Sequence, residues 1–346
     1  MKKIFLFAAI AALTLTGCSK DQNVEKSDSD VIGFRAVSGK STKGTSIDGT
    51  NFLGFRVFAY QTASGGTIPG SGVKPDFMYD VAVTRAAVGD NFAYSPAKYW
   101  PSNGNVHFYA YGPATTAATF ATASGVEGQP VINFSVNASV AAQEDLIWAK
   151  MEGRNKTNTG TNPVNFTFAH ALSQVVFQAK SGAEALKFNI TKVELVTVKN
   201  AGSFNLKNGA WVGAPTGTAT YGIDGTMLAN NTNIDNTAFV NLTGTNGAMM
   251  VMPQTLTAGT ASPVNTSSGT YIRITFGAKD GDVAIVEDGS TYTVPFGGFD
   301  LEQNKRYVIQ MTLSGNSDGS GEPVAITFSG TVSDWETPDV TKPIGM

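Results

Sequence analysis

The feature that most constrains this fold is a recurrent two-residue alternation of apolar and polar side chains. Within residues 52–60, Leu53, Phe55, Val57 and Ala59 fall on one face of a two-residue alternation, and Arg56 falls on the other. Successive side chains of a strand point to opposite faces of a sheet, so this period predicts a half-buried strand. The same alternation returns at residues 106–111, 173–179, 271–276 and 307–313.

Helical patterns are scarce. No stretch of twelve or more residues keeps a 3.6-residue apolar period with caps, and the nearest, residues 138–150, reads equally well as a turn and a strand. Glycine supplies 38 of 346 residues, which exceeds an average near 7% and favours many short turns. We therefore expect an all-β fold.

Local irregularities can also be placed. The apolar parity switches between Ile190 and Val193, which predicts a β-bulge around Thr191 and Lys192. The pair Asp280-Gly281 and the stretch 287–290 are typical of hairpin turns, because glycine accepts the positive φ that such turns require.

A chain of 346 residues is long enough for about two domains. The most polar interior stretch, residues 153–163, lies almost midway and suggests a junction. We expect one β-sandwich over residues 31–162 and a second, with a short tail, over residues 163–346.

The N-terminus has the form of a secretory signal. Lys2 and Lys3 precede twelve apolar residues, 4–15, which span about 18 Å as a helix and are too short for a hydrocarbon core near 30 Å. The following Leu15-Thr16-Gly17-Cys18 resembles the lipobox of bacterial lipoproteins. We expect residues 1–17 to be a signal peptide and Cys18 to carry lipid.

A buried or free thiol is the other interpretation of Cys18, but no second cysteine is present to pair with it. Residues 18–30 are polar and lack aromatics, so we expect a flexible tether. Ser19 and Lys20 after the cysteine resemble the sorting pattern of outer-membrane lipoproteins.

Charge and motifs exclude several function classes. The net charge of −3 gives no basic surface for nucleic acid. Two histidines and one cysteine offer no metal-ligand spacing, and no nucleotide loop or nucleophile elbow is present, so we expect no cofactor, no metal and no enzyme. A pair of the 27 acidic residues could still serve a glycosidase, which sequence spacing cannot test.

Aromatic residues near a turn leave an alternative open. Tyr99, Trp100 and Tyr109 would form a sugar platform in a surface glycan-binding lipoprotein, or they pack in the core. Packing is the favoured interpretation. We expect His107 and His170 to be structural, hydrogen-bonded histidines.

Several motifs recur in an order that resembles the fimbrillin family of Bacteroidetes, lipoprotein precursors of type V pilus subunits and anchors. Besides the lipobox, they are Val31-Ile32-Gly33-Phe34-Arg35-Ala36, Phe55-Arg56-Val57-Phe58-Ala59-Tyr60, Tyr94-Ser95-Pro96-Ala97-Lys98-Tyr99-Trp100-Pro101, His107-Phe108-Tyr109-Ala110-Tyr111, Phe168-Ala169-His170-Ala171-Leu172-Ser173 and Val332-Ser333-Asp334-Trp335.

The resemblance implies two transthyretin-like β-sandwich domains in tandem and delivery to the outer membrane and cell surface as a lipoprotein. It implies a fimbrial subunit, tip or anchor that supports adhesion to a host protein or glycan. Its partners would be other pilus subunits, joined by donor-strand addition after a protease frees the first strand.

In this chain the first strand would span residues 31–37, and Arg35, Lys40 and Lys43 are the cut sites that the resemblance suggests, with Lys43 preferred. The family usually has Arg at this place, and an ordinary solvated loop at residues 38–44 is the alternative. Residues 336–346 contain two prolines and would make a poor long donor strand, so stalk, tip and anchor roles stay open.

Overall fold

The computed structural model describes residues 30–38, 51–70, 73–121, 130–159, 163–244, 246–261, 268–315, 324–335 and 341–343. Most of the regular structure in these residues is β-strand, and the predicted all-β class is confirmed. The helical elements include α1 (Lys156–Thr159) and two single 3-10 turns, η2 (Val140–Ala142) and η3 (Gly225–Met227). None of the described helices is long and apolar enough to cross a membrane.

Two sheets contain the N-terminal strands. The first sheet has the order β1-β8-β7-β4-β2-β3, and the second has the order β12-β11-β6-β5. Their bounds are β1 (Phe34–Ser38), β8 (Val164–His170), β7 (Ile147–Arg154), β4 (Asn105–Gly112), β2 (Gly54–Thr62), β3 (Met78–Thr84), β12 (Ala210–Thr216), β11 (Ala201–Asn205), β6 (Val131–Ser135) and β5 (Thr119–Phe120).

Three further sheets contain the C-terminal strands. The third sheet has the order β13-β10-β17-β18, the fourth β14-β9-β20-β21-β22 with β15 also on β9, and β16 pairs with β19. Their bounds are β13 (Ala219–Asp224), β10 (Leu186–Val198), β17 (Tyr271–Asp280), β18 (Val283–Pro295), β14 (Val240–Asn241), β9 (Ser173–Ser181), β20 (Lys305–Gly315), β21 (Val324–Asp334), β22 (Thr341–Pro343), β15 (Met249–Val251), β16 (Gln254–Leu256) and β19 (Phe299–Leu301).

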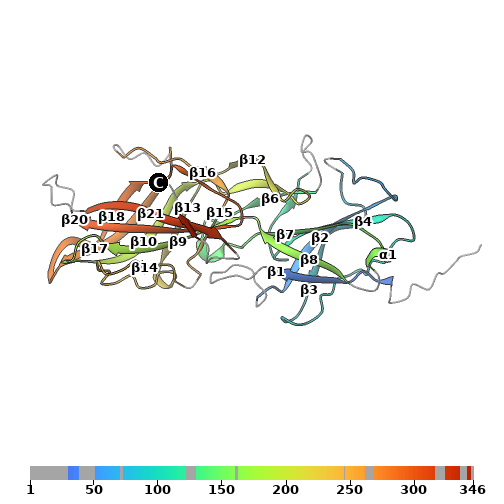
Figure 1. Ribbon diagram of the computed structural model, residues 1–346, viewed down its shortest axis with the longest axis horizontal. Helices are drawn as coiled ribbons and strands as arrows, with labels where there is room; N and C mark the ends of the chain where they lie inside the picture. The colour runs from blue at the N-terminus through green and yellow to red at the C-terminus, as the bar shows by residue number, and fades with distance from the viewer. Residues whose placement is uncertain are drawn as a thin grey trace, which may run out of the picture.

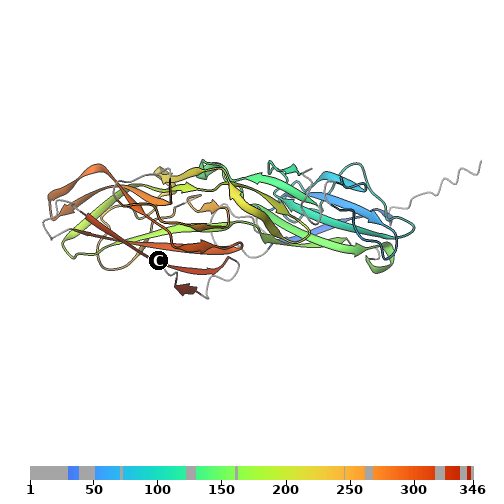
Figure 2. The same cartoon turned by 90° about the horizontal axis from the view of Figure 1, so that it is seen from above.

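The molecule is elongated, with the first sheet in one lobe and the third and fourth sheets in the other (Figures 1 and 2). One apolar cluster runs through both lobes, from Phe58 and Tyr109 in the first sheet to Ile309 in the fourth sheet and Trp335 just after β21. A second cluster lies on the opposite face of the first sheet and includes Phe55. Because both faces of the first sheet carry core, its strands are held by packing on two sides.

This two-sided burial corrects one expectation. The strand predicted as half buried at residues 52–60 is β2, and its second face is also buried, with Phe58 1% and Tyr60 0% exposed. Leu53, predicted on the buried face, precedes β2 and is 46% exposed. Phe58 and Tyr60 contact the core that the second sheet shares. Arg56 tolerates this position because Asp80 accepts hydrogen bonds from its Nε and Nη2 atoms at 2.7 and 2.9 Å.

The predicted irregularities met different outcomes. The bulge near Thr191 is confirmed, because the register of β10 against β17 shifts between Ile190 and Lys192. The turn at Asp280-Gly281 is also confirmed, since β17 ends at Asp280 and Gly281 has φ +58°. The turn expected at residues 287–290 is wrong: these residues lie inside β18, where the register against β17 shifts and Gly289 has φ +88°.

The predicted junction can be compared with the strand pairing. Residues 153–163 include α1 and connect β7 to β8, which pair with each other in the first sheet. The second sheet pairs β6, before residue 163, with β11 after it. Both sheets therefore run across the predicted boundary, and the division into two tandem domains stays a prediction.

Candidate functional site

The first strand of the fold, β1, occupies an edge of the first sheet. It pairs in parallel with β8, from Phe34 opposite Val164 to Ser38 opposite Phe168. Every other strand pair described in this sheet is antiparallel. Among the described residues β1 has β8 as its one strand neighbour, so its departure would leave the other pairings intact.

A short clamp holds the residues that lead into β1. The Ile32 amide donates to the Lys98 carbonyl at 2.8 Å, and the Tyr94 hydroxyl donates to the Ile32 carbonyl at 2.8 Å. Burial raises the pKa of Tyr94, which keeps this hydroxyl protonated and able to donate at neutral pH. The Trp100 amide donates to the Asp30 carbonyl at 3.0 Å.

Phe34 anchors β1 in the core. Its side chain is 4% exposed and its ring contacts four others. The ring centroids lie 5.4 to 6.1 Å away, in edge-on or stacked arrangements, and belong to Tyr94, Phe108, Phe166 and Phe55. Aromatic pairs at these separations stabilise the fold by more than the burial of their apolar surface alone. Without β1, this pocket and the edge of β8 would be exposed together.

Arg35 is the second residue of β1 and has an exposed side chain, opposite Asn165 of β8. Both residues also line a cavity of about 460 Å³ beside β1, together with Arg85 and Phe92. The Arg85 guanidinium stacks on the Phe92 ring at 4.8 Å and donates to the Phe52 carbonyl at 2.7 and 2.9 Å. The other predicted site residues, Cys18, Lys40 and Lys43, lie outside the described residues.

The acceptor strand β8 is held differently along its length. Residues 164–168 pair with β1, whereas β7 pairs with β8 at Ala169 and His170 in the described part of the sheet. Phe166 and Phe168 point into the core on the same face as Phe34. The groove that β1 fills therefore has a backbone edge and an aromatic floor.

The aromatic sugar platform is wrong. Tyr109 is 0% exposed, and its hydroxyl donates to Glu152 Oε1 at 2.5 Å. Trp100 is 8% exposed, with its ring edge-on to Phe108 at 6.0 Å. Only Tyr99 of the three is half-buried, so the set cannot present its ring faces to a glycan. The alternative of core packing is confirmed for Tyr109 and Trp100.

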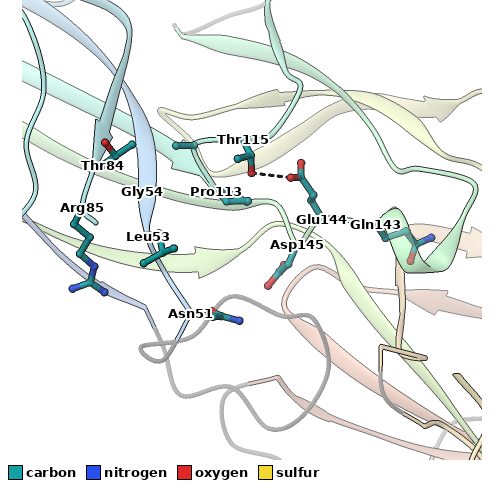
Figure 3. Close-up of a pocket in the computed structure, with 11 residues that line it drawn as sticks. Asn51, Leu53, Gly54, Thr84, Arg85, Pro113, Thr115, Gln143, Glu144 and Asp145 are labelled. Carbon is teal, nitrogen blue, oxygen red and sulfur yellow. Dashed lines mark hydrogen bonds between the residues drawn. The ribbon is translucent and has the colours of Figure 1, made fainter. Parts of the chain in front are cut away.

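A separate pocket of about 450 Å³ lies at the start of β2 (Figure 3). Its polar groups are committed to structural contacts. Thr115 donates to Glu144 at 2.9 Å, Gln143 Oε1 accepts from the Met250 amide at 2.7 Å, and Asp145 contacts His170. Nothing in this lining selects a ligand. No group of three or more His, Cys, Asp or Glu side chains that could hold a metal occurs within the described ranges.

One contact was not anticipated from the sequence. The motifs around His170 and Trp335 were singled out separately, and the two rings stack at a centroid distance of 4.2 Å. The residues are too far apart in the chain for any local pattern to predict the contact. The burial expected of a structural histidine was the one available signal.

Taken together, the strand order and the all-β lobes define a β-sandwich protein with β1 at the edge of its first sheet. A sequence model described as fimbrillin-like matches residues 42–335. The chain therefore belongs to the fimbrillin-like family, whose characterised members are fimbrial proteins of the cell surface.

Two relatives illustrate the similarity. The chain is 29% identical over 190 residues to the fimbrium subunit Fim1C of Phocaeicola vulgatus, a match that covers 49% of each protein. It thus spans about half the length of that curated relative. A crystal structure of a fimbrial protein from Bacteroides vulgatus superposes with a TM-score of 0.60 at 18% identity, over 88% of this chain and 99% of the other, which supports the fold.

Proposed function

We propose that this protein is a structural subunit of a cell-surface fibre and that it joins its neighbours by strand exchange at the β1 position. The observation that carries the proposal is the way β1 is held. It is an N-terminal, parallel edge strand with one described strand neighbour, and it fills an aromatic pocket with Phe34.

The physical logic of exchange follows from what β1 covers. Its departure would expose the backbone donors and acceptors of residues 164–168 and the apolar pocket of Phe34. An exposed strand edge beside an apolar groove is a template for another strand. A partner strand that supplies a large apolar residue at the Phe34 position would satisfy both requirements at once.

The pairing of β1 distinguishes the three candidate cleavage sites. A protease binds its substrate in an extended form that is free of other pairing, and Arg35 is paired with Asn165 within β1. A cut after Arg35 would also leave part of the strand behind. Lys40 and Lys43 follow the end of β1 at Ser38, so we propose a cut after one of them, with Lys43 preferred.

The proposal also covers how the chain reaches the cell surface and which place it takes in the fibre. We propose that the chain is exported as a lipoprotein, with lipid on Cys18 and residues 18–30 as the tether to the outer membrane. Within a fibre it would serve as a stalk, tip or anchor subunit that supports adhesion, in two transthyretin-like sandwiches. Its partners would be other fibre subunits.

Limited trypsin digestion of the folded protein, with mass spectrometry of the new ends and native sizing, tests the proposal. We expect one early cut after Lys40 or Lys43, release of residues 30–38 and formation of larger species. A cut chain that releases this strand yet stays monomeric and binds no strand from a second subunit would contradict it.

A further inference from the structure

His170, Asp145 and Trp335 form a buried cluster, which we call the latch. His170 Nδ1 lies 2.7 Å from Asp145 Oδ2, and the imidazole stacks on the Trp335 ring at 4.2 Å with 5° between the planes. The exposed fractions of the three residues are 2%, 0% and 0%. Because a carboxylate oxygen accepts hydrogen bonds, the imidazole donates to Asp145 in this pair.

Backbone hydrogen bonds join the same three segments. The Ala171 amide donates to the Leu146 carbonyl at 2.8 Å, the Asn304 amide to the Leu172 carbonyl at 2.9 Å, and the Trp335 amide to the Asn304 carbonyl at 3.1 Å. The latch therefore ties the start of β7 and the end of β8 to the end of β21, which belongs to the fourth sheet.

The position of His170 in β8 places the latch next to the residues that pair with β1. His170 is the last residue of β8, two positions beyond the residue that pairs with the end of β1. Residues 164–168 pair with β1, and β7 pairs with β8 only at Ala169 and His170 in the described sheet. When β1 leaves, the end of β8 at His170 is the fixed point from which the rest of the strand extends.

We propose that the latch positions β8 while β1 is absent, so that an incoming strand meets an edge that is already extended. This inference rests on the proposed function, since it concerns the interval between loss of one strand and gain of another. A preformed edge spares the partner the entropy cost of ordering β8 during binding. His170, Asp145 and Trp335 are positioning residues in this account, and they do not contact the partner strand.

Hydrogen exchange of the β8 amides in the full chain tests the latch. Phe34→Asp places a carboxylate among four aromatic rings and drives β1 out, without any need for a protease. We expect His170→Ala alone to leave the exchange of residues 164–168 within about twofold, because β1 still covers them. In the Phe34→Asp background we expect the same change to speed their exchange by at least about tenfold.

An effect of His170→Ala that is equal with and without Phe34→Asp would overturn the proposal, because it would mark a general structural role. His107→Ala is the matched control: it removes the other histidine, which lies in β4, and should show no dependence on Phe34. If Phe34→Asp prevents folding, Phe34→Ala is used in its place. If His170→Ala prevents folding, Asp145→Asn is used in its place.

A peptide of residues 30–38 separates failure of the latch from failure of the proposed function. We expect it to bind the Phe34→Asp chain and to bind more slowly when His170→Ala is added. If the peptide never binds, the strand-exchange function is contradicted, while the exchange rates still decide the latch. If it binds at the same rate to both chains, the latch is overturned and the function stands.

Discussion

At the scale of single residues, His107 links packing to pH. Its Nδ1 accepts the Gly153 amide at 3.3 Å and its Nε2 lies 3.2 Å from Thr62 Oγ1, an arrangement that suits the neutral ring. Burial lowers the pKa of His107, with a smaller contribution from the charge of Lys207 and an opposing one from Glu152. Protonation is therefore easier in the unfolded chain than in the folded one.

The sign of the pH effect follows. Below the unfolded-state pKa, near 6.5, the unfolded chain binds more protons than the folded chain, so acidification lowers the free energy of unfolding. The stability that the neutral His107 ring contributes is fully present above pH 6.5 and is lost as the pH falls toward the lower pKa of the folded state. We predict that His107→Gln weakens the pH dependence of stability below pH 6.5. Urea unfolding of the unchanged chain and of His107→Gln between pH 7.5 and 5 measures this dependence. Identical slopes of unfolding free energy against pH for the two chains would contradict the prediction.

Gly104 shows where the backbone requires glycine. It has φ +84°, and an added Cβ would lie 2.0 Å from the Thr62 carbonyl oxygen. Gly65 has φ +74° but an open surrounding, which makes it a matched control. We predict that Gly65→Ala costs about 1–2 kcal/mol of unfolding free energy for its left-handed backbone, and that Gly104→Ala costs clearly more. Equal losses in urea unfolding would contradict the steric argument.

At the scale of elements, β1 combines strong anchoring with easy separation. Phe34 packs as deeply as core residues of the other lobe, yet its strand has one described strand neighbour. Loss of packing at Phe34 should therefore release β1 before the sheet unfolds. Loss of packing at a residue such as Phe276, in the middle of the third sheet, should instead destabilise the whole fold.

This contrast gives a prediction. Phe276→Ala should lower the global free energy of unfolding by about 3–5 kcal/mol, whereas Phe34→Ala should lower it less and speed trypsin cleavage after Arg35 by at least about tenfold. Arg35 becomes a substrate once β1 is unpaired. Urea unfolding and timed mass spectrometry measure the two effects. Comparable global losses without faster cleavage at Arg35 would show that β1 does not detach locally.

The strands were predictable because alternation is a local property. The bulge near Thr191 followed from a change of parity, which is also local. The turn expected at residues 287–290 failed because a glycine with positive φ serves a turn and a bulge equally well, and only the partner strand decides. The parallel pairing of β1 and the stack of His170 on Trp335 join residues more than 100 positions apart, so no local pattern contains them.

At the scale of the whole molecule, one core runs through both lobes. A side-chain hydrogen bond also joins the segment before β7 to the fourth sheet, because the amide of Met250 in β15 donates to Gln143 Oε1 at 2.7 Å. A continuous core makes separate unfolding of the lobes costly, because each would expose apolar surface that the other covers.

We therefore predict one cooperative unfolding transition for the full chain. Calorimetry should give equal calorimetric and van't Hoff enthalpies, and the fluorescence of Trp100, which packs in the lobe of the first sheet, should change at the same urea concentration as the far-ultraviolet circular dichroism of the whole chain. A variant that keeps Trp100 as its one tryptophan isolates the fluorescence signal. Two resolved transitions would instead support two independent domains.

In the proposed strand exchange, β1 leaves its position before subunits join. Arg35 and Asn165 are both exposed and directly opposite across the β1–β8 pair, at a spacing of roughly 4.8 Å that suits a disulfide. In a chain with Cys18→Ser, the double change Arg35→Cys and Asn165→Cys would lock β1 reversibly.

The most direct measurement is the size of the assembled species after protease treatment, in the oxidised and reduced states of this locked chain. We predict that the oxidised chain stays monomeric after the cut and that the same sample forms larger species once reductant is added. Assembly of the oxidised chain at the rate of the reduced chain would contradict it.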